Sequence, residues 1–68
     1  MTKILRWKEF PLFAPSQSGW YMINCKVHNI YITSVSFFDI HTGSWYEGSA
    51  KEKNIEGVGA FNPKLISA

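Results

Sequence analysis

The sequence lacks the cross-links by which many small proteins reinforce a small core. It contains one cysteine, Cys25, so no disulfide can form within the chain. A chain of 68 residues buries only about 60 % of the surface that its unfolded form exposes. A core of this size supplies roughly 3–5 kcal/mol unless a disulfide or a metal adds to it. The length therefore allows one small domain of modest stability.

Long apolar stretches are also missing. The longest apolar run covers residues 20–23, far below the roughly 18 residues of a membrane-spanning helix. Residues 1–6 lack the apolar segment of about 7–15 residues that a signal peptide requires. A lone cysteine is typical of a reducing compartment. We therefore expect a cytoplasmic protein that makes no contact with a membrane.

Few residues are suited to catalysis or metal binding. Cys25, His28, Asp39 and His41 are the ligand types that zinc accepts, but a hairpin would separate residues 28 and 39 by roughly 30 Å along one strand. The five glycines are isolated and form no phosphate-binding loop. We therefore expect no metal, no cofactor and no catalytic residue, and hence a protein that is not an enzyme.

Charge of one sign is scarce. Seven basic and five acidic residues give a formal net charge of +2, and the basic residues are spread along the chain. Nucleic-acid-binding proteins usually gather positive charge on one face. The charge pattern therefore favours a mixed, solvated surface.

Aromatic residues are abundant. Five Phe, three Trp and three Tyr make up 16 % of the chain, and each large ring buries about 150–250 Å² when it is enclosed. These rings can compensate for the missing disulfide. We expect most of them to form the core and a few to face a partner.

Residues 19–48 show the clearest structural pattern. Apolar side chains recur at every second position from residue 21, which predicts a strand with one face on a core; they are Tyr21, Ile23, Cys25 and Val27. Residues 30–38 are rich in β-branched and aromatic residues, which favour strands. Only His28 and Asn29 separate the two runs, and asparagine tolerates the positive φ of a two-residue hairpin loop.

A third strand is expected at residues 45–47, after a turn in which Asp39 caps backbone N–H groups and Gly43 adopts a left-handed conformation. The flanks are less regular. Residues 1–18 are expected to form an extended arm that lays Phe10, Leu12 and Phe13 over the sheet. Residues 49–57 form a charged loop or a short helix, and residues 58–68 a weak strand and a tail.

These expectations define a mainly β fold. We predict one domain, built on an antiparallel meander of three to four strands, either open or barrel-like, with an extended N-terminal arm and at most one short helix. Read strand by strand, the alternation leaves one face partly exposed, with Trp20, Met22, Ile30 and Ile32 on it. Exposed aromatic residues, methionine and isoleucine are typical of protein interfaces.

The order of several short motifs resembles a family of small phage and prophage proteins of unknown function. The resemblance is carried by Trp7, by residues 15–22 (Pro-Ser-Gln-Ser-Gly-Trp-Tyr-Met), by residues 37–39 (Phe-Phe-Asp) and by residues 42–46 (Thr-Gly-Ser-Trp-Tyr). The family usually closes with a His-Trp motif, where this chain has residues 58–61 (Val-Gly-Ala-Phe). The resemblance implies a phage or mobile-element protein that acts in the host cytoplasm.

The leading functional hypothesis is a non-enzymatic module that binds a host protein and inhibits or modulates it. The expected anchors are Trp20, Met22, Trp45 and Tyr46, because a few aromatic side chains dominate most interfaces. A small nucleic-acid-binding barrel is one alternative, in which phosphates would be contacted by Arg6, Lys8, Lys26 and Lys51 and bases would stack on Trp20, Tyr21 and Phe38. A self-associating structural subunit, for example a homodimer, is the other.

Overall fold

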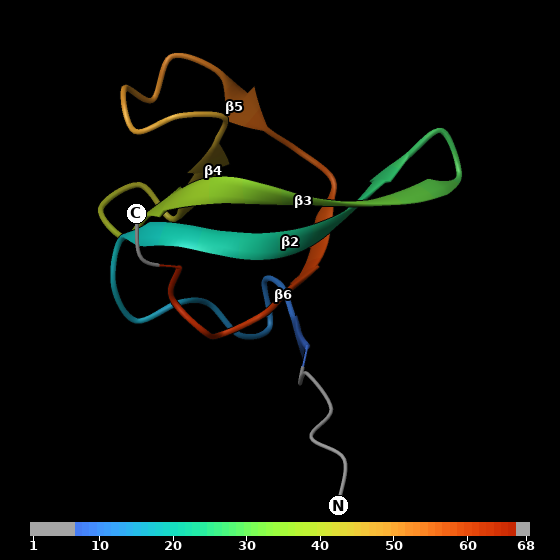
Figure 1. Ribbon diagram of the computed structural model, residues 1–68, viewed down its shortest axis with the longest axis horizontal. Helices are drawn as coiled ribbons and strands as arrows, with labels where there is room; N and C mark the ends of the chain where they lie inside the picture. Colours follow the sequence, from blue (N-terminus) through green and yellow to red (C-terminus); the bar gives the residue numbers. More distant parts are fainter. Residues whose placement is uncertain (1–6, 67–68) are drawn as a thin grey trace, which may run out of the picture.

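The computed structural model describes residues 7–66, which form a six-stranded antiparallel sheet without a helix (Figure 1). The strands are β1 (Lys8–Glu9), β2 (Gly19–Val27), β3 (Ile30–Asp39), β4 (Ser44–Tyr46), β5 (Asn54–Ile55) and β6 (Val58–Phe61). Their order in the sheet is β1-β6-β2-β3-β4-β5. The mainly β fold and the central meander predicted from the sequence are confirmed, and no helix in residues 7–66 is long and apolar enough to cross a membrane.

The hairpin between β2 and β3 has the predicted two-residue loop. His28 and Asn29 have φ angles of 50° and 66°, so both adopt the left-handed conformation that such a loop requires. Val27, just before the loop, pairs with Ile30, just after it. The loop therefore fixes the register of the two longest strands of the protein.

The turn between β3 and β4 is built as the sequence predicts. Asp39 Oδ1 accepts a hydrogen bond from the backbone N–H of His41 at 3.1 Å. Gly43 has a φ of 70° and donates its N–H to the carbonyl of Asp39 at 2.8 Å. These two contacts reverse the chain and align Ser44 opposite Asp39.

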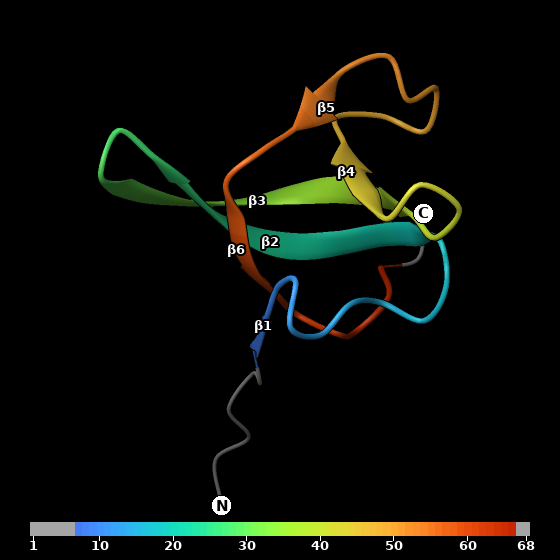
Figure 2. The ribbon, with the colours of Figure 1, turned by 180° about the vertical axis from the view of Figure 1, so that it is seen from behind.

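The sheet is strongly curled (Figure 2). The strands β5 and β6 are separated by three others in the sheet order, yet only Glu56 and Gly57 connect them in the chain. Each residue extends the chain by at most about 3.6 Å, whereas adjacent strands lie about 4.8 Å apart, so a flat sheet could not hold this connection. The sheet curls without closing into a barrel, which corrects the barrel-like form of the prediction.

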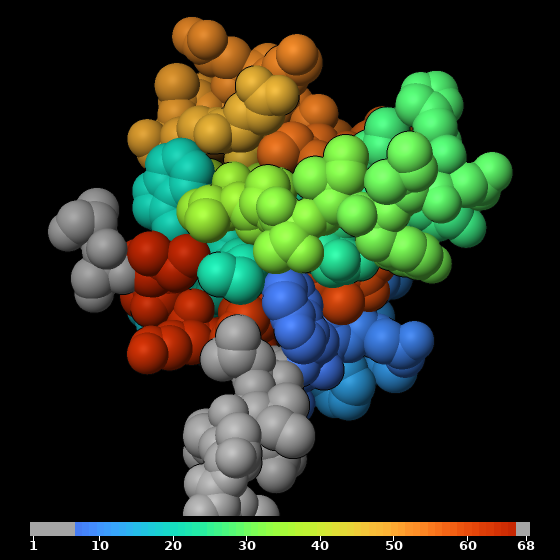
Figure 3. Space-filling view, turned by 45° about the vertical axis from the view of Figure 1, so that its right-hand side comes forward, coloured from blue at the N-terminus to red at the C-terminus, as the bar shows by residue number. Residues whose placement is uncertain are grey.

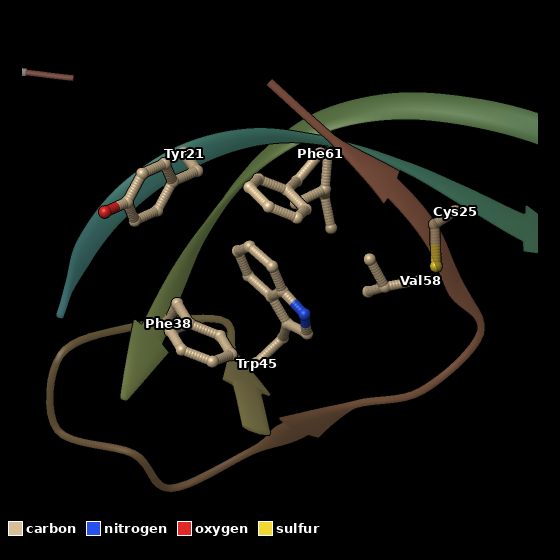
Figure 4. Close-up of a cluster of buried hydrophobic side chains, with 7 residues drawn as sticks. Tyr21, Cys25, Phe38, Trp45, Val58 and Phe61 are labelled. Atoms are coloured by element: carbon tan, nitrogen blue, oxygen red, sulfur yellow. The ribbon is translucent and has the colours of Figure 1, made fainter. Parts of the chain in front are cut away.

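The concave side of the curled sheet encloses the core (Figure 4). Its buried members are Tyr21, Ile23, Cys25, Phe38, Trp45, Val58 and Phe61, with Phe10 and Ile55 packed against them. Trp45 lies at the centre, with its ring centroid 4.8 Å from that of Phe38 and 5.9 Å from that of Phe61. Five of the seven enclosed residues come from β2, β3 and β4, the predicted meander.

The flanks add three strands that the predicted meander did not include or left weak. The N-terminal arm contains β1, and of its three predicted covering side chains only Phe10 packs on the core, against Phe38 and Trp45. Leu12 and Phe13 are 72 % and 49 % exposed. Residues 49–57, predicted to form a charged loop or a short helix, form a loop that contains β5, and the weak strand expected within residues 58–68 is β6.

Candidate protein-interaction surface

The register of β2 and β3 decides which side chains share a face. Because Val27 pairs with Ile30, the odd-numbered residues of β2 share a face with the even-numbered residues of β3. Ile30 and Ile32 therefore lie on the side of Cys25 and the core. The expectation that they share a face with Trp20 and Met22 is wrong, because the two-residue loop sets a register in which Ile30 and Ile32 lie opposite Val27 and Cys25.

The opposite side of the sheet, which we call the outer face, carries three of the four predicted anchors. Trp20, Phe37 and Tyr46 lie side by side on β2, β3 and β4. Trp20 and Phe37 pack edge to face with their centroids 5.6 Å apart. Met22 and Val35 form the next row. The outer face thus joins half-buried aromatic side chains and the half-buried Met22 to the exposed Val35.

Trp45, the fourth predicted anchor, lies on the concave side of the sheet. It is 1 % exposed, because it pairs with Phe38 one position away from the outer-face pair of Phe37 and Tyr46. Its indole Nε1 is buried without a hydrogen-bond partner among the described residues. In this fold a partner could reach Trp45 only after the core opened.

The β2–β3 hairpin extends beyond the body of the protein (Figure 3). We define residues 26–33 as the hairpin arm. Pairing of β2 with β6 ends at Cys25, and pairing of β3 with β4 begins only at Phe37, so neighbouring strands leave this arm uncovered. Large apolar side chains are consequently exposed on it and beside it: Val27 40 %, Ile30 63 %, Tyr31 66 %, Ile32 47 % and Val35 48 %.

The chemistry of the arm is apolar and aromatic with one positive charge. Lys26 Nζ lies 5.8 Å from the centroid of the Tyr31 ring, within the range of a cation–π contact. Asn24 Nδ2 donates to Thr33 Oγ1 at 3.4 Å in the next row of the outer face. Residues 30–36 contain no ionisable side chain other than the phenol of Tyr31.

The basic residues considered for phosphate binding lie apart in the sheet. Lys8 is on the edge strand β1, Lys26 is at the far end of β2, and Lys51 lies in the loop before β5. Lys51 Nζ is held by Asp39 at 3.1 Å. Arg6 lies outside the described residues.

Two of the three rings considered for base stacking belong to the core. Tyr21 and Phe38 are 3 % and 2 % exposed. Burial raises the pKa of the Tyr21 phenol, and its O–H donates to the Gln17 carbonyl at 2.9 Å. Of the stacking residues expected in the nucleic-acid alternative, only Trp20 is partly accessible.

Groups with catalytic or ligand chemistry do not converge. Cys25 is buried and its thiol donates to the carbonyl of Glu56 at 3.2 Å. His28 lies at the tip of the arm, whereas Asp39 and His41 lie at the opposite end of β3. Within residues 7–66 no group of three or more His, Cys, Asp or Glu residues is placed to hold a metal ion.

A shallow hollow of about 240 Å³ lies between the segment before β2 and the end of β6. Its lining includes Lys8, Gln17, Tyr21 and Phe61. The Tyr21 hydroxyl already donates to the Gln17 carbonyl. The ammonium group of Lys8 is the charged group in the lining. The exposed arm is the more distinctive surface.

The exposure of the arm has a signal in the sequence. The runs that end at residue 27 and at residue 38, which form β2 and β3 with nine and ten residues, are longer than the third predicted strand, of three residues, could cover. Unequal strand lengths in a meander leave the longer hairpin unpaired on its outer side. The lengths of these runs, as well as their composition, therefore indicate an uncovered arm.

Searches against protein-family models, curated proteins and solved structures find no match to this chain. The resemblance to a phage family stays a prediction.

Proposed function

We propose that this chain is a non-enzymatic protein-binding module, and that the hairpin arm with the adjoining outer face is its binding surface. Large hydrophobic side chains are exposed on both faces of the arm, with Tyr31 on the outer face 66 % exposed and Ile30 on the concave side 63 % exposed. Contiguous exposed apolar surface of this kind marks interaction sites in soluble proteins. This observation carries the proposal.

The arm's exposed side chains contribute little to the stability of the isolated chain. Among the described residues, the only ring or cation contact of Tyr31 is with Lys26, and Ile30 lies beyond the last core residue of β2, Cys25. Burying one such side chain in a complex contributes roughly 1.5–3 kcal/mol. A partner that encloses both faces of the arm would therefore use Tyr31 on the outer face and Ile30 and Ile32 on the concave side as its principal anchors.

The outer face extends this surface toward the body of the protein. Trp20, Met22 and Tyr46 are half-buried there, and they retain the anchor role expected from the sequence. Trp45 has no part in the surface, because it is enclosed. A partner that covers the arm would meet an apolar centre bordered by Lys26 and by the polar pair Asn24 and Thr33.

The biological role proposed with this surface is that of a phage or mobile-element accessory protein that modulates a host protein in the host cytoplasm. The support is the sequence resemblance together with a surface suited to protein contact. The partner is accordingly a host protein with an exposed apolar patch.

The test is an affinity capture from bacterial lysate with three baits: the wild-type chain, Tyr31→Ala and Leu12→Ala. Leu12 is 72 % exposed and lies outside the arm, so its variant controls for the loss of one exposed apolar side chain. We expect a host protein that is retained by the wild type and by Leu12→Ala and is lost with Tyr31→Ala. Circular dichroism on both variants shows whether the fold is kept.

Nuclease treatment of half of each lysate separates the alternatives. A partner that survives nuclease supports the protein-binding module. Loss of every partner with nuclease, together with affinity that falls steeply between about 50 and 200 mM salt, favours the nucleic-acid alternative. Equal capture by the wild type and Tyr31→Ala would place the binding surface elsewhere.

A further inference from the structure

One side of β3 has free backbone hydrogen-bonding groups along the hairpin arm. The even-numbered residues of β2 form backbone hydrogen bonds on the side of β6 and the C-terminal segment. The Trp20 carbonyl accepts from the N–H of Ile66 at 2.9 Å, and the Met22 carbonyl accepts from the N–H of Asn62 at 2.8 Å. The Lys26 N–H donates to the Gly57 carbonyl at 3.0 Å. Backbone groups alternate in direction along an antiparallel strand. The odd-numbered residues of β2 therefore bond to β3.

The same alternation identifies the free groups of β3. The odd-numbered residues of β2 lie opposite the even-numbered residues of β3, so Tyr31, Thr33 and Val35 direct their N–H and C=O groups away from β2. On that side β4 pairs only from Phe37 onward. No other backbone bond within residues 7–66 involves these three residues.

This edge differs from the two outermost strands of the sheet. β1 consists of the charged residues Lys8 and Glu9, and β5 consists of Asn54 and Ile55. Very short edge strands and charged edge side chains both discourage pairing with another chain. The free side of β3 spans residues 30–36, which contain no proline, no glycine and no Lys, Arg, Asp or Glu. A long neutral edge of β-branched residues is a template for an additional strand.

A second copy of the same strand fits this edge in one register. With Thr33 opposite Thr33 of the second copy, Tyr31 lies opposite Val35 and every free N–H and C=O group of the three residues finds a partner. A shift of two residues in one direction places Tyr31 opposite Phe37, which already pairs with Tyr46. A shift of two residues in the other direction places Val35 opposite Asn29 in the hairpin loop, whose φ is 66°. Either shift leaves one of the three residues unpaired.

The side chains match in the same register. On the concave side, Ile30 lies opposite Ser36 and Ile32 opposite Ser34, so that a large side chain meets a small one. On the outer face, Tyr31 pairs with Val35, and aromatic residues pair favourably with β-branched ones across strands. The two threonines meet on the axis beside Asn24 of each copy, and threonine pairs can hydrogen-bond across strands. No like charges are opposed.

We propose that the protein forms a two-fold symmetric dimer by antiparallel pairing of the free edges of β3, centred on Thr33. The pairing uses backbone edges and leaves both faces of the arm accessible. It goes beyond the proposed function, because it joins two outer faces into one surface without requiring a host partner. It also gives hydrogen-bond partners to the free backbone groups of β3, and its two-fold symmetry closes the assembly at two copies.

The first test measures the mass of the purified full chain by sedimentation velocity over a range of concentrations. We expect a species of twice the 7.8 kDa chain mass that dissociates on dilution. Thr33→Lys places two positive charges opposite each other on the dimer axis, and Thr33→Asp places two negative charges there. Each variant alone should raise the dissociation constant of the dimer roughly fivefold or more. An equal mixture of the two variants should restore dimerisation, because opposite charges then face each other. Ser49→Lys adds the same charge in an exposed loop and should leave dimerisation unchanged.

The second test uses the wild-type chain and does not depend on any variant folding. Amide exchange of Tyr31, Thr33 and Val35 should slow at concentrations where the dimer forms, whereas the amides of Ile32 and Ser34, bonded to β2 in both states, should not change. A chain that is monomeric at every concentration, a larger assembly, or a dimer indifferent to charge at Thr33 would each overturn the proposal. A monomer would leave the edge to a strand of another protein.

Discussion

The ammonium group of Lys51 lies 3.1 Å from Oδ2 of Asp39 and ties the loop between β4 and β5 to the end of β3. The other carboxylate oxygen, Oδ1, accepts the N–H of His41. One carboxylate, only 3 % exposed as a residue, thus holds the β3–β4 turn and the following loop together. The side-chain hydrogen bond from Lys51 and then the backbone hydrogen bond from His41 lower the pKa of Asp39 below its ordinary value of 3.8.

This lowered pKa predicts a loss of stability in acid. A carboxyl group whose pKa is lower in the folded state stabilises the fold fully above its unfolded pKa, and this contribution falls as the pH drops through the folded pKa. The free energy of unfolding of the wild type should exceed that of Asp39→Asn by a constant amount above about pH 5, and the difference should shrink below pH 3.8. Urea unfolding of both proteins over this pH range measures it.

The control for this prediction is Lys51→Met, which keeps the aliphatic stem and removes the charge. It should move the acid transition to higher pH, toward the ordinary pKa of an aspartate, because the main cause of the lowered pKa is absent. A difference between the wild type and Asp39→Asn that does not vary with pH would show that the ion pair contributes nothing through the charge of Asp39.

Trp45 and Trp20 should respond differently to truncation. Trp45→Ala removes the centre of the core and should cost about 3–5 kcal/mol, comparable to the whole stability expected of so small a core. Trp20→Ala, on the half-buried outer face, should cost about 1 kcal/mol. Thermal unfolding followed by circular dichroism compares them.

Trp45→Phe is the matched variant for the core. It keeps an aromatic ring against Phe38 and Phe61 and removes the buried Nε1–H that has no hydrogen-bond partner among the described residues. Since an unsatisfied buried donor is itself destabilising, this variant should be clearly more stable than Trp45→Ala. Equal losses in Trp45→Ala and Trp20→Ala would contradict the placement of Trp45 in the core.

The central meander could be predicted because its signals are local. Alternation placed Tyr21 and Ile23 in the core, and His28 and Asn29 identified the hairpin loop, since the conformations involved are properties of neighbouring residues. The same loop contained the register that would have placed Ile30 correctly. The face of Ile30 follows only when β2 and β3 are considered together through the register of this loop, because the alternation within one strand does not relate its faces to those of the other.

The curl of the sheet and its short strands depend on distant contacts. A strand of two residues, such as β1 or β5, has no periodicity to detect. The curl follows from the two-residue connection of Glu56 and Gly57, which constrains the sheet only once the strand order is known. Whether Trp45 or Tyr46 faces the core likewise depends on pairing with β3 rather than on the short run in which they lie.

Three glycines should rank in a defined order when each is replaced by alanine. Gly57 has a φ of 85°, and a Cβ there would lie 2.9 Å from the Lys26 carbonyl oxygen. Gly43 has a φ of 70° with open space around it, and Gly59 has open space and no positive φ. A left-handed alanine costs about 1–2 kcal/mol, so Gly43→Ala should lose about that much and Gly57→Ala more.

Gly59→Ala serves as the control of this series, and its free energy of unfolding should stay within about 0.5 kcal/mol of the wild type or rise slightly, because alanine favours a strand over glycine. Chemical denaturation of the three variants gives the ranking. A loss for Gly57→Ala no larger than for Gly43→Ala would mean that the close approach of residue 57 to Lys26 is easily relaxed.

Replacement of asparagine by glycine should stabilise the protein in the hairpin loop and destabilise it in β5. Asn29 has a φ of 66°, which glycine adopts without a steric penalty, so Asn29→Gly should stabilise the protein by up to about 1 kcal/mol. Asn29→Val should destabilise it by about 1 kcal/mol or more, because β-branched residues rarely tolerate positive φ. In β5, where Asn54 is an exposed strand residue, Asn54→Gly should instead cost about 0.5–1 kcal/mol. Thermal unfolding of the three variants measures these effects, and a gain at both Asn29 and Asn54 would show that the left-handed loop is not its origin.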